Sequence, residues 1–345
     1  MSTADVAVDR GPGGERSRRL TEMVFRMREL GIVLALALLI AVTAILEPRF
    51  IHLDSLQDLA RNASIIAIMA AGQTMVLLTR NVDLSVGSVL GLSAFFAGDL
   101  LSNHHVAIPL VFLLCIVLGI VCGLINGVLT TFGKVPALVV TLGTLYIFRG
   151  IAFVYTNGRQ INAETLPDKF LNIGTGTVWK IPTIALIAFV VVLIVGQYLR
   201  DFRSGREMYA VGSNEDAAKL AGIRVDRRIV TAFVASGALA GLGGALYTAR
   251  FGTVDATAGT GYELTVISAA VVGGVAITGG VGSVYGAAIG AVLLGCITSS
   301  LIVLRIDSFW QQAAVGALLV AAIAFDRLVG LRLDSALRQR SARRA

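Results

Sequence analysis

Charge is scarce in this sequence. Charged residues occupy 15% of its 345 positions, whereas an ordinary soluble domain carries about 25%. Hydrophobic residues reach 56%, and the mean hydropathy is +0.80. A chain this long and this apolar is predicted to cross a membrane many times, in contact with lipid, rather than to fold around one soluble core.

Histidine and cysteine are also few, with three of each. The cysteines Cys115, Cys122 and Cys296 stand alone inside apolar runs, which predicts packing residues rather than disulfides or metal ligands. The sequence has no HExxH motif, no nucleophile elbow with triad partners and no paired carboxylates on one expected face. We therefore expect no enzyme active site, no metal and no cofactor.

A nucleotide-binding loop is missing as well. The nearest approach is the stretch 127–134, which has five residues between its glycines instead of four. Val135 stands where Ser or Thr should follow Lys134. The chain is not expected to bind ATP itself, so any ATP hydrolysis would belong to a separate subunit.

The apolar residues fall into ten runs, most of them close to the roughly 20 residues that cross a bilayer as a helix. These runs are 29–46, 62–79, 84–101, 106–131, 137–155, 181–199, 229–251, 262–277, 281–304 and 308–325. They predict an all-α polytopic membrane protein with about ten transmembrane helices. The expected domains are a cytoplasmic N-terminal tail (1–28), a transmembrane domain (29–325) that includes a cytoplasmic loop (200–228), and a basic cytoplasmic C-terminal tail (326–345).

The distribution of basic residues supports this topology. The net charge of +7 could suggest nucleic acid, but the basic residues lie between and outside the apolar runs. With the N-terminal tail in the cytoplasm, 21 of the 29 Lys and Arg residues fall inside and five outside. Short cytoplasmic loops carry such an excess in membrane proteins. The charge therefore predicts both termini in the cytoplasm and no nucleic-acid partner.

One polar segment, residues 200–228, interrupts the apolar runs and contains the signals of a short helix over 214–221. Ser213 is predicted to cap its N-terminus together with Asp216, and Gly222 is predicted to end it. A helix of about two turns is not stable alone in water. We interpret it as an element on which another protein pushes.

Polar residues within or at the ends of apolar runs are costly and are therefore candidates for function. The candidates for a translocation path are Gln73, Asp83, Ser85, Asn126, Arg149 and Glu263. Other roles stay open: Gln73 and Asn126 as hydrogen-bonding contacts between helices, Asp83 as a cap, and Arg149 as a partner of helix-end carbonyls.

Several motifs occur in collinear order over about residues 30–326. They are Thr79-Arg-Asn-Val-Asp-Leu-Ser-Val-Gly-Ser88, Asn126-Gly127, Lys134-Val-Pro136, Thr141-Leu-Gly-Thr144 with Arg149-Gly150, Ala210-Val-Gly-Ser-Asn214 with Ala221-Gly222, Gly259-Thr-Gly-Tyr-Glu-Leu264, and Gly273-Gly274 to Gly279-Gly280. Together they resemble bacterial ABC importer permeases of the ribose/xylose/arabinose type. Within that family, residues 79–83 and 304–310 look most like autoinducer-2 (Lsr-type) permeases, with rhamnose and ribose permeases close.

The resemblance implies a multi-pass subunit of the bacterial inner membrane that imports a monosaccharide or a sugar-like signal. It implies a second permease copy or a paralogue, cytoplasmic ABC ATPase subunits and an extracytoplasmic solute-binding protein as partners. It also identifies 213–222 as a coupling helix that docks on the ATPase. The implied coupling residues are Ser213, Glu215, Asp216, Ala217, Ala218, Leu220, Ala221 and Gly222.

Two alternatives come from other classes. An ion-coupled secondary transporter of a small polar solute would need buried proton or sodium sites, and clear mid-span carboxylates are scarce here. A membrane-embedded enzyme would need catalytic residues that the sequence lacks.

Overall fold

The fold is a helical bundle, seen in a computed structural model that describes residue 34, residues 36–307, and residues 310, 312–314, 316, 317 and 320. The predicted tails, 1–28 and 326–345, lie outside the described residues, as does most of the predicted span 308–325. The predicted all-helical, multi-pass architecture is confirmed. Two strands of two residues each are the exception within the described part of the chain.

Six of the described helices are long and apolar enough to cross a membrane. They are α2 (Leu53–Leu78), α4 (Ile108–Thr131), α5 (Ala137–Thr156), α7 (Thr183–Asp201), α10 (Val225–Phe251) and α12 (Val284–Val303). Shorter apolar helices are Leu36–Leu46, α3 (Val86–Ser102) and α11 (Tyr262–Val272).

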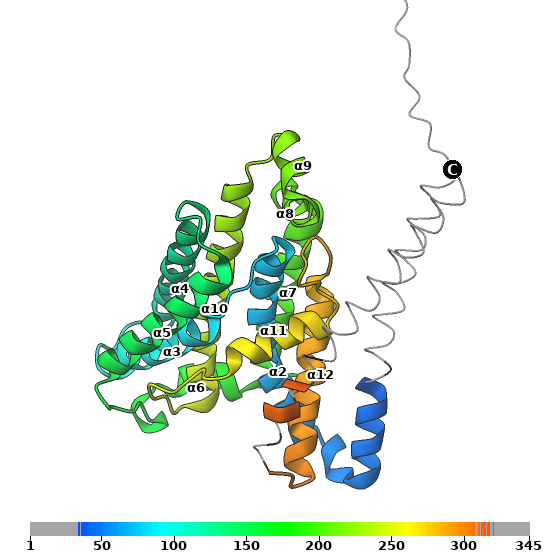
Figure 1. Ribbon diagram of the computed structural model, residues 1–345. Coiled ribbons are helices and arrows are strands. Elements are labelled where there is room, and N and C mark those ends of the chain that lie inside the picture. The colour runs from blue at the N-terminus through cyan, green and yellow to red at the C-terminus, as the bar shows by residue number, and fades with distance from the viewer. Residues whose placement is uncertain are drawn as a thin grey trace, which may run out of the picture.

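Short elements occupy the two ends of the bundle (Figure 1). Helices α8 (Arg203–Ser213) and α9 (Glu215–Leu220) lie at one end, which we call the α9 end. Helix α6 (Asp168–Thr175) lies toward the other, the α6 end. The remaining short elements are η1 (Pro48–Ile51), η2 (Ala163–Thr165) and the antiparallel strands β1 (Thr177–Val178) and β2 (Ile181–Pro182), in which Thr177 pairs with Pro182.

Helices α4 and α10 touch backbone to backbone because glycines line both faces. A Cβ atom on Gly119 would lie 2.0 Å from the carbonyl oxygen of Gly237, and one on Gly241 would lie 2.2 Å from that of Cys115. Small residues spaced four apart permit such close approach between membrane helices. Any side chain larger than hydrogen at Gly119 or Gly241 would therefore force the helices apart.

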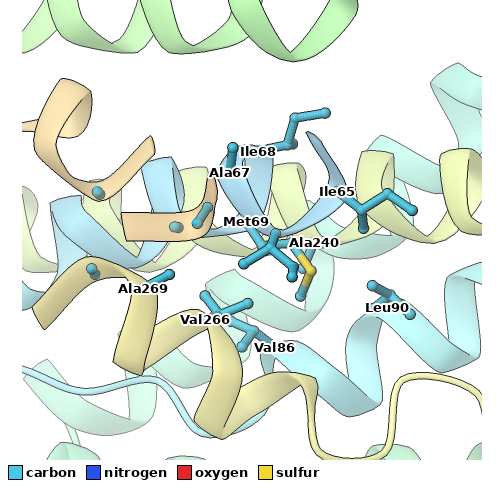
Figure 2. Close-up of a cluster of buried hydrophobic side chains, with 14 of the residues drawn as sticks. Ile65, Ala67, Ile68, Met69, Val86, Leu90, Ala240, Val266 and Ala269 are labelled. Carbon is cyan, nitrogen blue, oxygen red and sulfur yellow. The ribbon is translucent and has the colours of Figure 1, made fainter. Parts of the chain in front are cut away.

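Helix α2 runs through the centre of the bundle. In its most apolar stretch 83% of the residues are buried, against 28% for α4 and 33% for α5 and α7. Figure 2 shows Met69 of α2 in one cluster with Val86, Ala240 and Val266, which belong to α3, α10 and α11. The outward apolar faces of the other helices, such as Val121 of α4, are left for lipid or another subunit.

Helix α2 is longer than the predicted apolar run at 62–79, because it is one continuous helix from Leu53. Its polar first half is held by contacts at the α6 end. Asp58 accepts hydrogen bonds from Arg61 and Arg250, both at 2.9 Å. These pairings let the helix extend beyond its apolar part.

The prediction of a complete span at 262–277 is also wrong. Helix α11 ends at Val272 after 11 residues, about 16 Å, and it runs across the bundle rather than along it (Figure 1). Gly274 follows with a left-handed φ of 99°, and Gly273 packs against the backbone of Gly286. Apolar composition continues past the helix end, so hydropathy alone did not reveal the break.

Candidate functional site

Helix α9 begins with a cap that differs from the predicted one. Ser213 is the last residue of α8, and Asn214 is the N-cap with extended backbone angles. The amide of Ala217 donates to Asn214 Oδ1 at 3.0 Å. An Asn cap satisfies the same free amide groups that a Ser cap would. The helix was therefore predicted correctly, with its start shifted by one residue.

The predicted end of α9 at Gly222 is confirmed. Gly222 has a φ of 78°, a left-handed conformation that costs glycine little. The amide of Gly222 donates to Lys219 O at 2.9 Å, and the amide of Ile223 donates to Ala218 O at 3.0 Å. These two bonds form the Schellman motif, which satisfies carbonyls that the helix end leaves free.

The apolar residues of α9 divide between two directions. Leu220 is 91% exposed, whereas Ala218 is 4% exposed and packs with Val211 of α8 and Val225 of α10. The resemblance implies Ala218 as a coupling residue, but its side chain is covered by α8 and α10 and packs α9 onto its own chain. The outward residues are Glu215, Asp216, Ala217, Lys219, Leu220 and Ala221.

Helix α8 anchors α9 to α10 through one buried carboxylate. Glu207 accepts hydrogen bonds from Arg203 Nε at 2.7 Å and from Arg228 Nε at 2.6 Å. The hydrogen bond from Arg203, followed by that from Arg228, holds the pKa of Glu207 below its usual range. A doubly paired carboxylate of this kind fixes the orientation of α8.

A second anchor joins α8 to the end of α2. The Arg80 guanidinium donates from Nε to Gly212 O and from Nη2 to Ser213 O, the latter at 2.8 Å. Gly280 donates its amide to Leu78 O at 3.0 Å. A Cβ atom on Gly212 would lie 1.8 Å from that same oxygen. These contacts hold α8 against the loop after α2.

That loop leads into a buried polar network. Ser85 donates its amide and its hydroxyl to Asp83 Oδ1 at 2.9 and 2.7 Å. Asn126 Nδ2 donates to Ser85 Oγ at 2.8 Å, and Thr144 Oγ1 donates to Asn126 Oδ1 at 2.7 Å. Ser236 of α10 reaches Asp83 Oδ2 at 3.4 Å. The network thus connects the start of α3 with α4, α5 and α10.

Gln73 joins the same network. In the amide orientation that satisfies both of its groups, Gln73 donates to Asp83 O at 3.3 Å and accepts from Asp83 N at 3.2 Å. Four of the six path candidates, Gln73, Asp83, Ser85 and Asn126, therefore lie together, and each is at most 1% exposed. For Gln73 and Asn126 this favours the alternative role as polar contacts between helices, since neither is open to solute in this conformation. Asp83 is not the cap of α3, because Ser85 holds that position and donates its amide to Asp83.

The other two path candidates lie around residues 252–261. Arg149 Nη1 donates to Ala256 O at 3.2 Å and to Ala258 O. Glu263 Oε1 accepts from the Gly261 amide at 3.2 Å, while its Oε2 is buried without a partner. Arg149 thus pairs with backbone carbonyls, as the alternative reading proposed, although these belong to an irregular segment and not to a helix end.

Sequence reasoning missed Arg80, Glu207 and Gly212 as anchors. In the sequence, Arg80 contributes only to the excess of cytoplasmic basic residues. No neighbouring residue indicates that its hydrogen-bond partners lie about 130 positions away. No group of three or more His, Cys, Asp or Glu residues that could hold a metal occurs in the part of the chain that the structure describes.

Comparison with known proteins assigns the bundle to a family. The model for "branched-chain amino acid transport system / permease component" matches residues 55–323. No solved structure matches the chain.

Several curated proteins are similar along almost their whole length. The ribose import permease protein RbsC of Haemophilus influenzae is 38% identical over 301 residues, covering 87% of this chain and 93% of that protein. The autoinducer 2 import system permease protein LsrC of Escherichia coli O9:H4 is 34% identical over 312 residues, covering 90% of each. LsrC of Salmonella choleraesuis is 36% identical over 312 residues, covering 90% of this chain and 89% of that one.

Proposed function

We propose that the solute of this chain is a monosaccharide or a sugar-like molecule. The premise is that the chain belongs to the branched-chain amino acid transport system / permease component family. It is therefore a non-catalytic, multi-pass permease of a bacterial ABC importer. Autoinducer-2 is the first choice, with ribose and rhamnose next. Support comes from relatives named for ribose and autoinducer 2, which match over about nine-tenths of the chain.

We further propose that α9 is the coupling helix on which a cytoplasmic ATPase docks. The observation that carries this proposal is the outward Leu220, 91% exposed on a helix that is capped at both ends. An apolar side chain on a short, preformed helix suits a groove on a partner. The anchors at Glu207 and Arg80 would pass the motion of the docked ATPase into the bundle.

The proposed assembly has two permease subunits, two ATPase subunits and a solute-binding protein outside the membrane. Both termini and α9 would then lie in the cytoplasm, as the basic residues predict. The exposed apolar faces of α4 and α5 leave area for a second permease, either a copy or a paralogue.

Uptake assays test the coupling. Leu220→Glu places a charge in the proposed contact and is expected to abolish uptake and co-purification of the ATPase. Phe132→Glu is the matched control, since Phe132 is 68% exposed at the α9 end but lies outside α8 and α9. Equal uptake by both variants would contradict the assignment of α9.

The transport class and the solute need separate measurements. An ATPase partner with an inactivated Walker lysine should stop uptake, whereas undiminished uptake would favour an ion-coupled transporter. Labelled autoinducer-2, D-ribose and L-rhamnose, each supplied with the cognate binding protein, should rank in that order. Preferential uptake of leucine, which the family description would allow, would refute the sugar assignment.

A further inference from the structure

An irregular segment, residues 252–261, enters the bundle from the α6 end. At its start, Val254 pairs with Ile161, with N–O distances of 2.9 and 3.0 Å. Four residues later, Ala258 is buried against α3, where a Cβ atom on Gly91 would lie 2.1 Å from Ala258 O. Gly91 is about 16 Å along the helix axis from the end of α3 at Ser102. The segment, which separates the predicted runs 229–251 and 262–277, thus reaches the middle of a membrane-crossing bundle.

Arg149 holds this segment in place. Its Nη1 donates to the carbonyl oxygens of Ala256 and Ala258. Arg149 stands about 10 Å along the axis from the end of α5 at Thr156. Non-helical backbone at this depth must find hydrogen-bond partners, because lipid offers none. The guanidinium supplies them on the inner side of the segment.

The other side of the segment is polar and open. Thr253, Asp255, Thr257 and Thr260 are all exposed. Asp255 Oδ1 accepts from the Thr257 amide at 2.8 Å and from the Thr257 hydroxyl at 2.6 Å, and Thr260 donates its hydroxyl to Thr257 O at 2.6 Å. These hydrogen bonds join the exposed polar residues of the segment to one another.

Exposed irregular backbone does not face hydrocarbon in membrane proteins; it lines water or is covered by protein. We propose that the open side of residues 252–261 lines an aqueous path at half depth and is a transit site for a neutral polyhydroxylated solute. The carboxylate of Asp255 accepts hydrogen bonds from solute hydroxyls, and the hydroxyl oxygens of Thr257 and Thr260, whose protons are donated within the segment, accept further ones. Leu264, 49% exposed on the following turn, offers an apolar surface to the carbon skeleton.

This site deepens the proposed function and rests on it for the class of solute, but its contact with water is testable without any solute. The test introduces Thr257→Cys or Thr260→Cys into the full transporter in membranes and measures labelling by a charged, membrane-impermeant methanethiosulfonate. The matched control is Val190→Cys on α7, 51% exposed on an apolar helix face. The native cysteines are all buried, so the unaltered protein gives the background.

We expect the Thr257 and Thr260 variants to label at least tenfold faster than the Val190 variant, because only the thiolate reacts and it forms in water. Labelling as slow as that of the Val190 variant would overturn the proposal. That result would mean that lipid or a neighbouring subunit covers the segment.

The binding role needs a solute as probe. With D-ribose, Asp255→Asn is expected to raise the KM for uptake about tenfold, because the solute loses one hydrogen bond to a charged group. D-ribose should also slow the labelling of the Thr257 variant. An unchanged KM with no protection would overturn the binding role. Fast labelling without any sugar uptake would instead contradict the proposed function and leave the aqueous path standing.

Discussion

Replacing Gly222 tests whether a formed α9 is required for transport. Gly222 has a φ of 78°, and a Cβ atom added there would meet nothing within 4 Å. A substitution therefore changes only the backbone energy and creates no clash. This makes the position suitable for a graded series, Gly222→Asn, Gly222→Ala and Gly222→Val, in which the side chain stays outside the packed bundle.

The magnitude follows from the left-handed conformation, which costs a non-glycine residue about 1–2 kcal/mol. Asn tolerates this region best, whereas a β-branched residue tolerates it worst. Since 1.4 kcal/mol is a factor of ten in an equilibrium, Val should lower the equilibrium constant for forming the helix end roughly 30-fold. Ala should reduce it about tenfold, and Asn by less. Six residues of helix cannot absorb the strain elsewhere.

The assay is ATP-driven uptake by the reconstituted transporter, together with hydrogen exchange of the Gly222 and Ile223 amides, which close the helix end. We expect uptake and exchange protection to fall in the order Gly, Asn, Ala, Val. Thermal unfolding of the bundle should stay unchanged through the series, because the Cβ contacts nothing. Full uptake by the Val variant with unprotected amides would refute the requirement for a formed α9.

Two further substitutions test the buried polar groups. Thr144→Val should destabilise the transporter by about 1–3 kcal/mol, because Asn126 Oδ1 loses its donor inside the bundle; a melting temperature within error of the parent would contradict this role. Glu207→Gln should remove a pH dependence of unfolding. Arg203 and Arg228 lower the pKa of Glu207, so its contribution is present above the ordinary glutamate pKa of about 4.3 and is lost as the pH falls through the lower folded value. Parent and variant should thus converge once the pH falls below that folded value, and equal stability at pH 7 would contradict the anchor.

Most membrane spans could be predicted from sequence because hydropathy is a local property. The runs at 106–131, 137–155, 181–199 and 229–251 correspond closely to α4, α5, α7 and α10. The break after α11 could not be predicted in this way, because the residues beyond Val272 are apolar too. The chain turns there through Gly274, which has a left-handed φ of 99°, while Gly273 packs against the backbone of Gly286.

Helix α9 shows which features of a short helix its local sequence can predict. Charges in the first turn and Gly222 at the end mark where the short helix begins and ends, since capping acts over four or five residues. Which side of that helix faces outward is not local. Ala218 is covered by Val211 and Val225, which the fold brings to it from two other helices.

The polar residues likewise separate what the sequence predicts about function from what only the tertiary structure shows. The sequence by itself determined that this is a membrane-crossing chain with a few costly polar side chains, because a scarcity of charge is visible in composition alone. Only the tertiary structure decided that Asp83 and Asn126 belong to one buried network while Arg149 supports an irregular segment at half depth. Hydrogen bonds between helices depend on positions in space, and residues more than 100 positions apart carry no local trace of their contact.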